Sequence, residues 1–276
     1  IVAVNLITAR DFDFGDVAAN ASNTRNGVVL PILAASIYLT IVTSVLGWWR
    51  PALYESKRQR RAPSWMWAIP VLAFVPCIAN IVRSDHRGEF TNAHWMWIII
   101  GFALVGYSEE LMTRGLLVTG FRSNMRESRV MLYSSVLFGV MHGLNIVFGQ
   151  AVGTSIVQMI GTIPMGILFY YLRRITGSLF VSMAVHALWD ISLVTFTGTS
   201  VALNELDTES VRPANLIGVI LLCAIAGAVH RKRLFRAGCG LAAAARDFPQ
   251  FRRRWTLTWI RCSCGVIWAS APTSAE

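Results

Sequence analysis

Two glutamates and an arginine follow directly on a long apolar run of this chain. The run extends from Trp95 to Tyr107, and Glu109, Glu110 and Arg114 come just after it. A charged side chain at the centre of a membrane helix costs about 3 kcal/mol by insertion scales, so such groups are usually functional and paired. Helix positions four apart share a face, whereas adjacent positions diverge by about 100°. The spacing therefore predicts that Arg114 pairs with Glu110 and that Glu109 points towards another helix.

Two later apolar runs carry histidines. His142 has Asn145 three residues after it, on the same helical face, and Gly139 and Gly143 form a pair of small residues that lets another helix approach closely. A lone histidine bonded to a backbone carbonyl is the simpler interpretation, but in hydrocarbon this side chain needs a polar partner. We therefore expect His142 to line a polar cavity.

The second histidine run contains His186 and Asp190, which are four residues apart and share a face. Asp190 could orient His186 by accepting its N–H, or both side chains could face one cavity. A His–Asp pair that only joins two helices is the alternative. That alternative explains one pair, but it does not explain polar groups in three separate runs.

These residue types suit the activation of water. A carboxylate or an imidazole can take a proton from water, while a second set of groups stabilises the oxyanion of a tetrahedral intermediate. No cofactor is required by this scheme, although Glu109, His142 and His186 would also make a two-His, one-Glu set for Zn²⁺ with an open position. Ser108 and Ser182 lie near charged groups, but neither is part of a Gly-x-Ser-x-Gly nucleophile elbow.

The elements that position these groups are predicted to be membrane helices. The chain of 276 residues is 54% hydrophobic and 14% charged, whereas a soluble domain has about 25% charged residues. Only helices and closed barrels satisfy the backbone within a bilayer, and the alternating strands of a barrel are absent from the sequence. We predict an all-α, polytopic transmembrane bundle. Its net charge of +10 lies in the loops, which excludes nucleic acid as a partner.

Seven apolar stretches are long enough to cross a bilayer. They are roughly Val28–Trp49, Ser64–Val82, His94–Met112, Val130–Phe148, Ala151–Leu172, Ser178–Phe196 and Ala214–Val229. Every second loop is basic, with Lys57–Arg61 after the first span, Arg122 after the third and Arg173 and Arg174 after the fifth. The positive-inside rule then places the N-terminus outside and these loops in the cytosol.

Three parts follow from this pattern. Residues 1–27 form an N-terminal extracytoplasmic segment, residues 28–236 form one membrane domain, and residues 237–276 form a cytoplasmic or interfacial tail. Ile1–Ala9 lacks a basic n-region and is not predicted to be a signal peptide. The five cysteines are scattered and odd in number, which argues against a disulfide framework.

The Glu109–Arg114 cluster lies near the predicted end of its span, so a helix-end ion pair at the membrane interface is an alternative to a catalytic cluster.

The three motifs together resemble a known family. Glu109-Glu110-x-x-x-Arg114, Phe138-x-x-x-His142 and His186-x-x-x-Asp190, in this order on three spans, are similar to the motifs of the CPBP family, which comprises type II CAAX prenyl endopeptidases and bacterial abortive-infection and bacteriocin-processing proteins. The resemblance covers about Ile98–Asp190.

The resemblance implies an intramembrane endopeptidase with a helical cavity open to the cytosol. Its substrate would be a membrane-associated protein or peptide, CAAX-like or other, and the protein would lie in the plasma membrane. By this resemblance Glu109 and His142 activate water, while His186 and Asp190 lie on the oxyanion side. Glu110 and Arg114 would form a pair that supports these catalytic residues, and Asn145 is predicted to be a further supporting residue of the site.

One departure from the family pattern concerns Asp190, because eukaryotic prenyl proteases have Asn there. An ionised Asp cannot donate a hydrogen bond to an oxyanion. Asp190 is therefore protonated, orients His186 or helps to bind a metal, and both metal-dependent and glutamate-dependent mechanisms stay open.

Two other functions compete with proteolysis. The same cavity could bind a peptide without cleaving it, as an immunity protein or another membrane partner would. A proton-coupled transporter is a further alternative, because chains of Glu, His and Asp can relay protons. The sequence has no inverted repeat or paired broken helices of the kind that transporters show, and the transporter ranks last.

Overall fold

The computed structural model describes residues 19–56 and 64–198, and this part of the chain is helical. The segments are α2 (Ala21–Asn23), the π-helix η2 (Thr24–Val29), α3 (Leu30–Leu46), α4 (Trp49–Leu53), η3 (Ser64–Trp67), α5 (Ala68–Arg83), η4 (Asp85–Glu89), α6 (Asn92–Glu110), the π-helix η5 (Leu111–Leu117), α7 (Val118–Phe121), α8 (Glu127–Met141), η6 (His142–Phe148), α9 (Val152–Thr176) and α10 (Leu179–Thr197). The predicted helical membrane fold is confirmed.

Six segments of the described chain are long and apolar enough to cross a membrane. They are Ala21–Leu46, Trp65–Arg83, Asn92–Phe121, Glu127–Val147, Val152–Thr176 and Leu179–Phe196. They correspond one to one with the first six predicted spans. The seventh predicted span, Ala214–Val229, and the tail 237–276 lie outside the described residues, as does most of the predicted segment 1–27.

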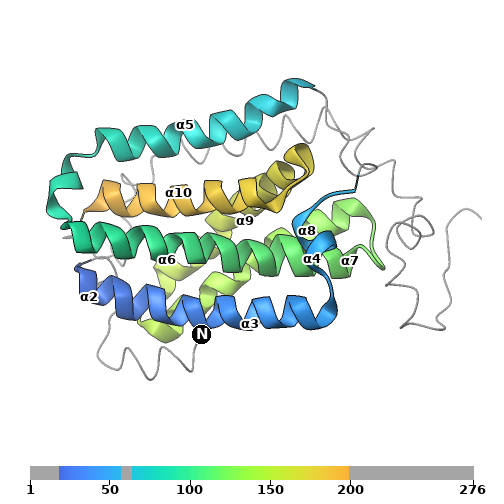
Figure 1. The fold of residues 1–276 in the computed structure, drawn as a ribbon, viewed down its shortest axis with the longest axis horizontal. Helices are drawn as coiled ribbons and strands as arrows, with labels where there is room; N and C mark the ends of the chain where they lie inside the picture. The colour runs from blue at the N-terminus through green and yellow to red at the C-terminus, as the bar shows by residue number, and fades with distance from the viewer. Residues whose placement is uncertain (1–18, 57–63, 199–276) are drawn as a thin grey trace, which may run out of the picture. The chain divides into compact units, whose positions relative to one another are not determined.

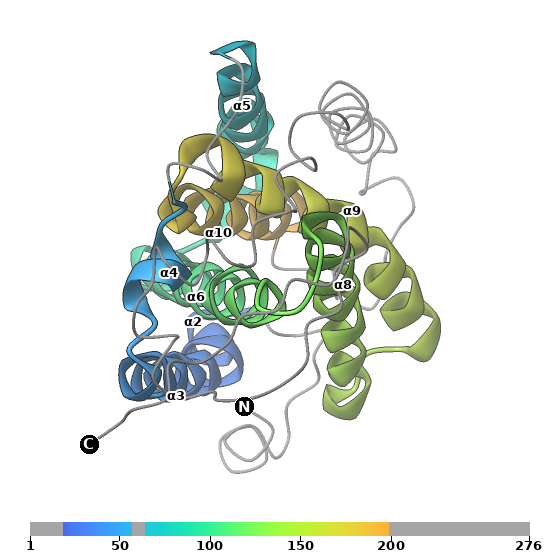
Figure 2. The same ribbon diagram turned by 90° about the vertical axis from the view of Figure 1, so that its right-hand side faces the viewer.

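The helices that carry the motifs pack against one another. In Figure 1, α6 lies between α3 and α10, and α10 lies between α6 and α5. The end view in Figure 2 shows α8 and α9 beside this layer, where α9 packs on both α8 and α10. The three motifs are therefore on neighbouring helices, although they are separated by long stretches of sequence.

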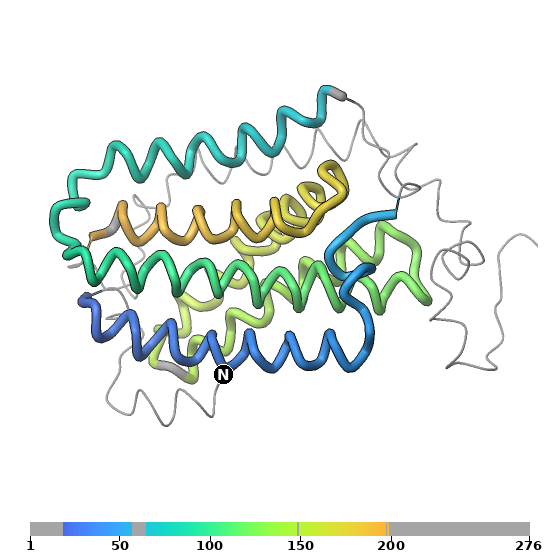
Figure 3. The backbone as a smooth tube through the Cα atoms, in the orientation of Figure 1, coloured from blue at the N-terminus to red at the C-terminus, as the bar shows by residue number. Residues whose placement is uncertain are grey.

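The third span is longer than the predicted His94–Met112. Helix α6 continues through η5 into α7, so that the span ends at Phe121 (Figure 3). Glu109 is then twelve residues, or about 18 Å, from that end at the rise of an α-helix. Glu110 and Arg114 have no exposed side-chain surface. Their complete burial among the helices differs from the solvated pair that a helix end at the interface would expose.

Glycines let the motif helices approach closely. A Cβ on Gly139 of α8 would lie 2.4 Å from the carbonyl oxygen of Met159 in α9, and one on Gly106 of α6 would lie 2.5 Å from the carbonyl oxygen of Met183 in α10. Real Cβ atoms do not come this near to backbone, so only glycine permits these crossings. The predicted role of Gly139 in helix packing is confirmed.

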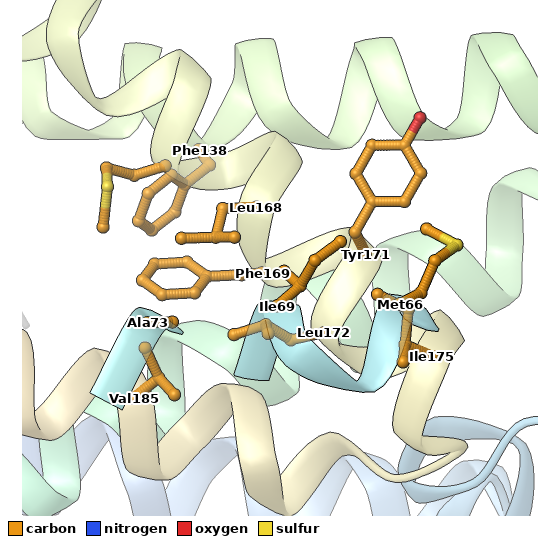
Figure 4. Close-up of a cluster of buried hydrophobic side chains, with 11 residues drawn as sticks. Met66, Ile69, Ala73, Phe138, Leu168, Phe169, Tyr171, Leu172, Ile175 and Val185 are labelled. Carbon is orange, nitrogen blue, oxygen red and sulfur yellow. The ribbon is translucent and has the colours of Figure 1, made fainter. Parts of the chain in front are cut away.

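The largest apolar core of the described chain lies among η3, α5, α8, α9 and α10. Its buried members are Met66, Ile69, Ala73, Phe138, Met165, Leu168, Phe169, Tyr171, Leu172, Ile175 and Val185. Figure 4 shows these side chains gathered between the helices. Moving one such side chain out of water would stabilise a fold by about 1.5–3 kcal/mol. Within a bilayer the alternative environment is lipid rather than water, so van der Waals packing between the helices provides the stabilisation instead. This core forms one wall of the site described below.

Buried charges lie where the sequence suggested solvated loops. Arg122, Arg173 and Arg174 surround the carboxylates of Glu55 and Glu127, in a group called the Glu55 network below. Burial alone would raise the pKa of the Glu55 carboxyl, but the three guanidinium groups outweigh it and hold that pKa below its ordinary value. The same carboxylates outweigh burial at Arg122, whose pKa lies well above its ordinary value. These arginines therefore bind protein carboxylates in addition to marking the predicted cytosolic side.

Candidate functional site

Helices α6 and α10 bring the first and third motifs together. The close crossing at Gly106 and Met183 lies one helical turn before Glu110 on α6 and one turn before His186 on α10. The two helices stay in contact around this crossing, with Ile98 packed near Ile191 and Val194 on one side of it and Gly115 near Leu179 on the other. Glu109, Glu110, Arg114, His186 and Asp190 meet there, and these five residues are called the carboxylate–histidine cluster below.

The predicted Glu110–Arg114 pair is confirmed. Nη1 of Arg114 donates to Oε1 of Glu110 at 2.8 Å and to the hydroxyl of Thr113 at 2.6 Å. Both charged side chains are fully buried. A buried guanidinium without its carboxylate would be strongly destabilising, so each member of the pair requires the other.

His186 is oriented by Glu110 rather than by Asp190. An ionised carboxylate can only accept, so Nδ1–H of His186 donates to Oε1 of Glu110 at 3.1 Å. The opposite ring nitrogen, Nε2, lies 3.6 Å from Oδ2 of Asp190 and 3.8 Å from Oε2 of Glu109. These distances exceed hydrogen-bond range. The sequence left open that Asp190 orients His186, but Glu110 does so. The spacing had predicted only Arg114 as the partner of Glu110, whereas Glu110 binds both Arg114 and His186.

Glu109 and Asp190 form the accessible edge of the cluster. Their side chains are 18% and 20% exposed, against 0% for Glu110 and 5% for His186. Oε2 of Glu109 has no hydrogen-bond partner within the described part of the chain. The prediction that Glu109 is not committed to Arg114 agrees with this geometry, and Glu109 and Asp190 are the two most exposed side chains of the cluster.

His142 joins the site through Phe138. Its Nδ1–H donates to the carbonyl oxygen of Phe138 at 2.8 Å, since that oxygen can only accept, and its ring packs edge-on against the Phe138 ring at 5.0 Å between centroids. No ion pair or hydrogen bond links His142 to Glu109 or His186 among the described residues. Asn145 is directed elsewhere, because its amide donates to Oε1 of Gln158 on α9 at 3.1 Å.

Aromatic rings enclose the charged groups. The guanidinium carbon of Arg114 lies 4.0 Å from the centre of the Phe138 ring and 5.3 Å from that of Phe169. Such cation–π contacts are worth up to about 2 kcal/mol when desolvated. The motif identified Phe138 in advance. The sequence did not distinguish Phe169, because an apolar residue within an apolar span has no pattern that sets it apart.

The proposed zinc ligands do not converge. Among residues 19–56 and 64–198, no three His, Cys, Asp or Glu side chains are arranged to hold one metal ion. The Nδ1 hydrogen bonds of His142 and His186 leave Nε2 of each ring available to a metal, so the obstacle is the lack of a convergent set of ligands rather than a blocked nitrogen. Glu109, His142 and His186 do not fit a single Zn²⁺ in this arrangement.

Gly166 of α9 makes room for Arg114. A Cβ at this position would lie 2.8 Å from Nη2 of Arg114 and 3.0 Å from the Cα of Ser135. We therefore expect Gly166→Ala to destabilise the protein by about 1–3 kcal/mol through overpacking, measured as thermal unfolding in detergent. Gly161→Ala is the matched control on the same helix, because nothing lies within 4 Å of its Cβ. Equal stability of the two variants would contradict this account.

Comparison with known proteins bears on the same segment. Residues 91–192 match a family model whose description is Type II CAAX prenyl endopeptidase Rce1-like. The match contains every site residue predicted from the sequence, and it excludes α3, α4 and α5. Neither the curated proteins nor the solved structures gave a match to the chain. The family predicted from the three motifs is confirmed over this segment.

Proposed function

We propose that the protein hydrolyses a peptide bond in a membrane-associated protein or peptide, with the carboxylate–histidine cluster as its active site. The match of residues 91–192 to the Type II CAAX prenyl endopeptidase Rce1-like family model supports this proposal. The single observation that carries the residue assignment is Glu109: a carboxylate inside a membrane span, partly exposed, without a hydrogen-bond partner in the described chain and 3.8 Å from Nε2 of His186.

Glu109 and His142 activate the water. The Glu109 carboxylate accepts a proton from water while the resulting hydroxide attacks the carbonyl carbon. Because Nδ1–H of His142 donates to the Phe138 carbonyl, its Nε2 presents a lone pair that can accept from the same water. The proton on Glu109 then passes to the nitrogen of the leaving amine as the C–N bond breaks. No metal ion is needed to balance these steps.

His186 and Asp190 stabilise the oxyanion. Oxygens of Glu110, Asp190 and Glu109 lie 3.1, 3.6 and 3.8 Å from the ring nitrogens of His186. In their protonated forms, Nε2–H of His186 or the carboxylic acid of Asp190 donates to the oxyanion, which answers the objection that an ionised Asp cannot donate. Glu110 and Arg114 support this arrangement, because Oε1 of Glu110 binds both Arg114 and His186.

The place of the cluster within the helices supports a proposal for the substrate class. Its groups are inside membrane spans, so the scissile bond must enter the apolar region, as the end of a lipid-modified chain can. We propose a CAAX-like substrate approaching from the cytosolic face of the plasma membrane.

The test is a peptidase assay with purified protein in liposomes. A fluorogenic peptide ending in a farnesylated CAAX sequence is compared with its unmodified counterpart, and the products are identified by mass spectrometry. We expect cleavage after the modified cysteine at a higher kcat/KM for the lipidated peptide. Absence of cleavage of every peptide, together with tight binding that survives Glu109→Ala, would instead support the non-catalytic function.

A further inference from the structure

Phe169 of α9 lies flat against the imidazole of His186. The two ring centroids are 4.8 Å apart and the ring planes differ by 14°. Phe169 is 1% exposed and belongs to the apolar core in which Figure 4 shows it beside Phe138. This contact crosses between two helices, and Phe169 is outside all three sequence motifs.

A single hydrogen bond does not fix the plane of an imidazole. The ring turns about its Cβ–Cγ bond, and the bond from Nδ1–H to Glu110 restrains that rotation at one atom of the ring only. Phe169 blocks that rotation by covering one face of the ring, and Phe138 meets the ring edge-on at 5.7 Å and 86°. With both aromatic contacts in place, Nε2 points towards Asp190 and Glu109.

The backbone of Phe169 is tied to the helix that carries His186. Ser182 lies one turn before His186 on α10, and its buried hydroxyl donates to the carbonyl oxygen of Phe169 at 2.9 Å. This bond sets the register of α9 against α10. The stacked rings therefore do not depend on apolar packing alone.

We infer that Phe169 is a positioning residue, whose flat ring holds the His186 imidazole in the plane that directs Nε2 into the active site. The inference rests on the proposed function for its catalytic consequence, whereas the orientation itself is independent of any activity. Phe169 does not touch the reacting atoms, and it acts through His186.

Removing the ring while keeping the apolar bulk is the direct test. We expect Phe169→Leu to lower kcat about 10–100-fold with KM unchanged within about twofold, because a misplacement of about 1 Å can cost about a hundredfold in rate. Phe169→Tyr keeps a flat ring and should retain kcat within about threefold. A rise in KM that accompanies the fall in kcat, or an equal fall in kcat in Phe169→Tyr, would overturn the inference.

Phe90→Leu is the matched control. Phe90 is also buried and also packs against a histidine, His94, with ring centroids 5.0 Å apart, but it belongs to a different apolar cluster. This variant should lose stability as Phe169→Leu does while kcat stays unchanged. An equal loss of kcat in both variants would mean that Phe169 has only a general packing role.

A second measurement does not require activity. In NMR of protein with isotopically labelled histidine, the Hε1 signal of His186, assigned with His186→Gln, should carry a ring-current shift that disappears in Phe169→Leu and persists in Phe90→Leu. Loss of the shift without loss of kcat in an active enzyme would overturn the positioning role. If the wild-type protein cleaves no peptide, the proposed function fails, and an unchanged shift in Phe169→Leu would overturn the inference separately.

Discussion

Replacement of Glu109 by glutamine is expected to lower kcat for peptide hydrolysis by about 10²–10⁴-fold, the usual contribution of a general base. Glutamine has nearly the same shape, but its amide cannot take a proton from water. The side chain is partly exposed and its Oε2 makes no hydrogen bond to the described chain, so the substitution breaks no hydrogen bond of that atom and weakens only the 3.8 Å ion pair with His186. Its effect should therefore fall on kcat, with stability nearly unchanged. Initial rates on the lipidated peptide and thermal unfolding of the same preparation measure the two quantities.

Two comparisons make this result specific. Asp85→Asn removes an exposed carboxylate from η4, outside the membrane spans, and should leave kcat unchanged. Glu110→Gln should reduce both activity and stability, because it deprives the fully buried Arg114 of its counter-charge. Full activity of Glu109→Gln would show that another group activates the water. A loss of activity accompanied by unfolding would assign Glu109 a structural role instead.

Spacing predicted contacts within one helix and could not predict contacts between helices. Glu110 and Arg114 are four residues apart, and they pair as predicted. His186 and Asp190 are also four apart, yet the carboxylate that binds Nδ1 of His186 comes from Glu110, which is 76 residues away in the sequence. The close crossing of α6 and α10 at Gly106 decides this partner. Such a crossing depends on three-dimensional packing, which a periodic pattern along one chain does not record.

The predicted end of the third span was wrong for a related reason. Glu109, Glu110 and Arg114 lower the apolar character of the sequence, so the predicted helix stops at Met112. In the structure, α6 contains both glutamates, η5 carries Arg114 in a π-helical turn, and α7 completes the span at Phe121. π-Helical turns occur frequently at functional sites. The pairing and aromatic contacts of Arg114 make its charge tolerable there, and none of these contacts is visible in a hydropathy pattern.

Residues without a chemical signature were missed altogether. Phe169 and Gly166 contact His186 and Arg114 directly, but their residue types are ordinary for a membrane helix. Glu55 was missed for the opposite reason, because it lies in a loop where an exposed charge is expected. All three matter through what packs against them, which only the fold reveals.

Replacement of Glu55 by glutamine is expected to destabilise the protein by about 3–5 kcal/mol, the cost of leaving a buried ion pair without one partner. Oε1 of Glu55 lies 2.8 Å from Nε of Arg173 and 3.0 Å from Nη2 of Arg122. The side chains of Glu55 and Arg173 are fully buried. The Glu55 network has three guanidinium groups and two carboxylates, so glutamine leaves three positive charges facing one negative charge. Thermal unfolding in detergent micelles measures the loss.

The network also connects distant parts of the chain. Arg173 donates to the carbonyl oxygen of Pro51 in α4, and the amide of Glu55 donates to the carbonyl oxygen of Gly177 after α9. Loss of the charge should therefore loosen α4 from the end of α9. Arg50→Gln, which changes an exposed charge in the same short helix, is the control and should shift stability by less than about 0.5 kcal/mol.

Acidification should act on wild-type protein in the same direction as the substitution. The pKa of Glu55 is lower in the folded protein than its ordinary value, so its ionisation stabilises the fold above the ordinary carboxyl pKa of about 4.3, and that stabilisation disappears as the pH falls through the folded pKa. Glu55→Gln should lack this part of the acid dependence.

In a double-mutant cycle, Arg173→Met should cost less in the Glu55→Gln background than alone, because it then removes an unpaired charge. Additive losses and identical acid dependence in both proteins would show that Glu55 and Arg173 are not energetically coupled.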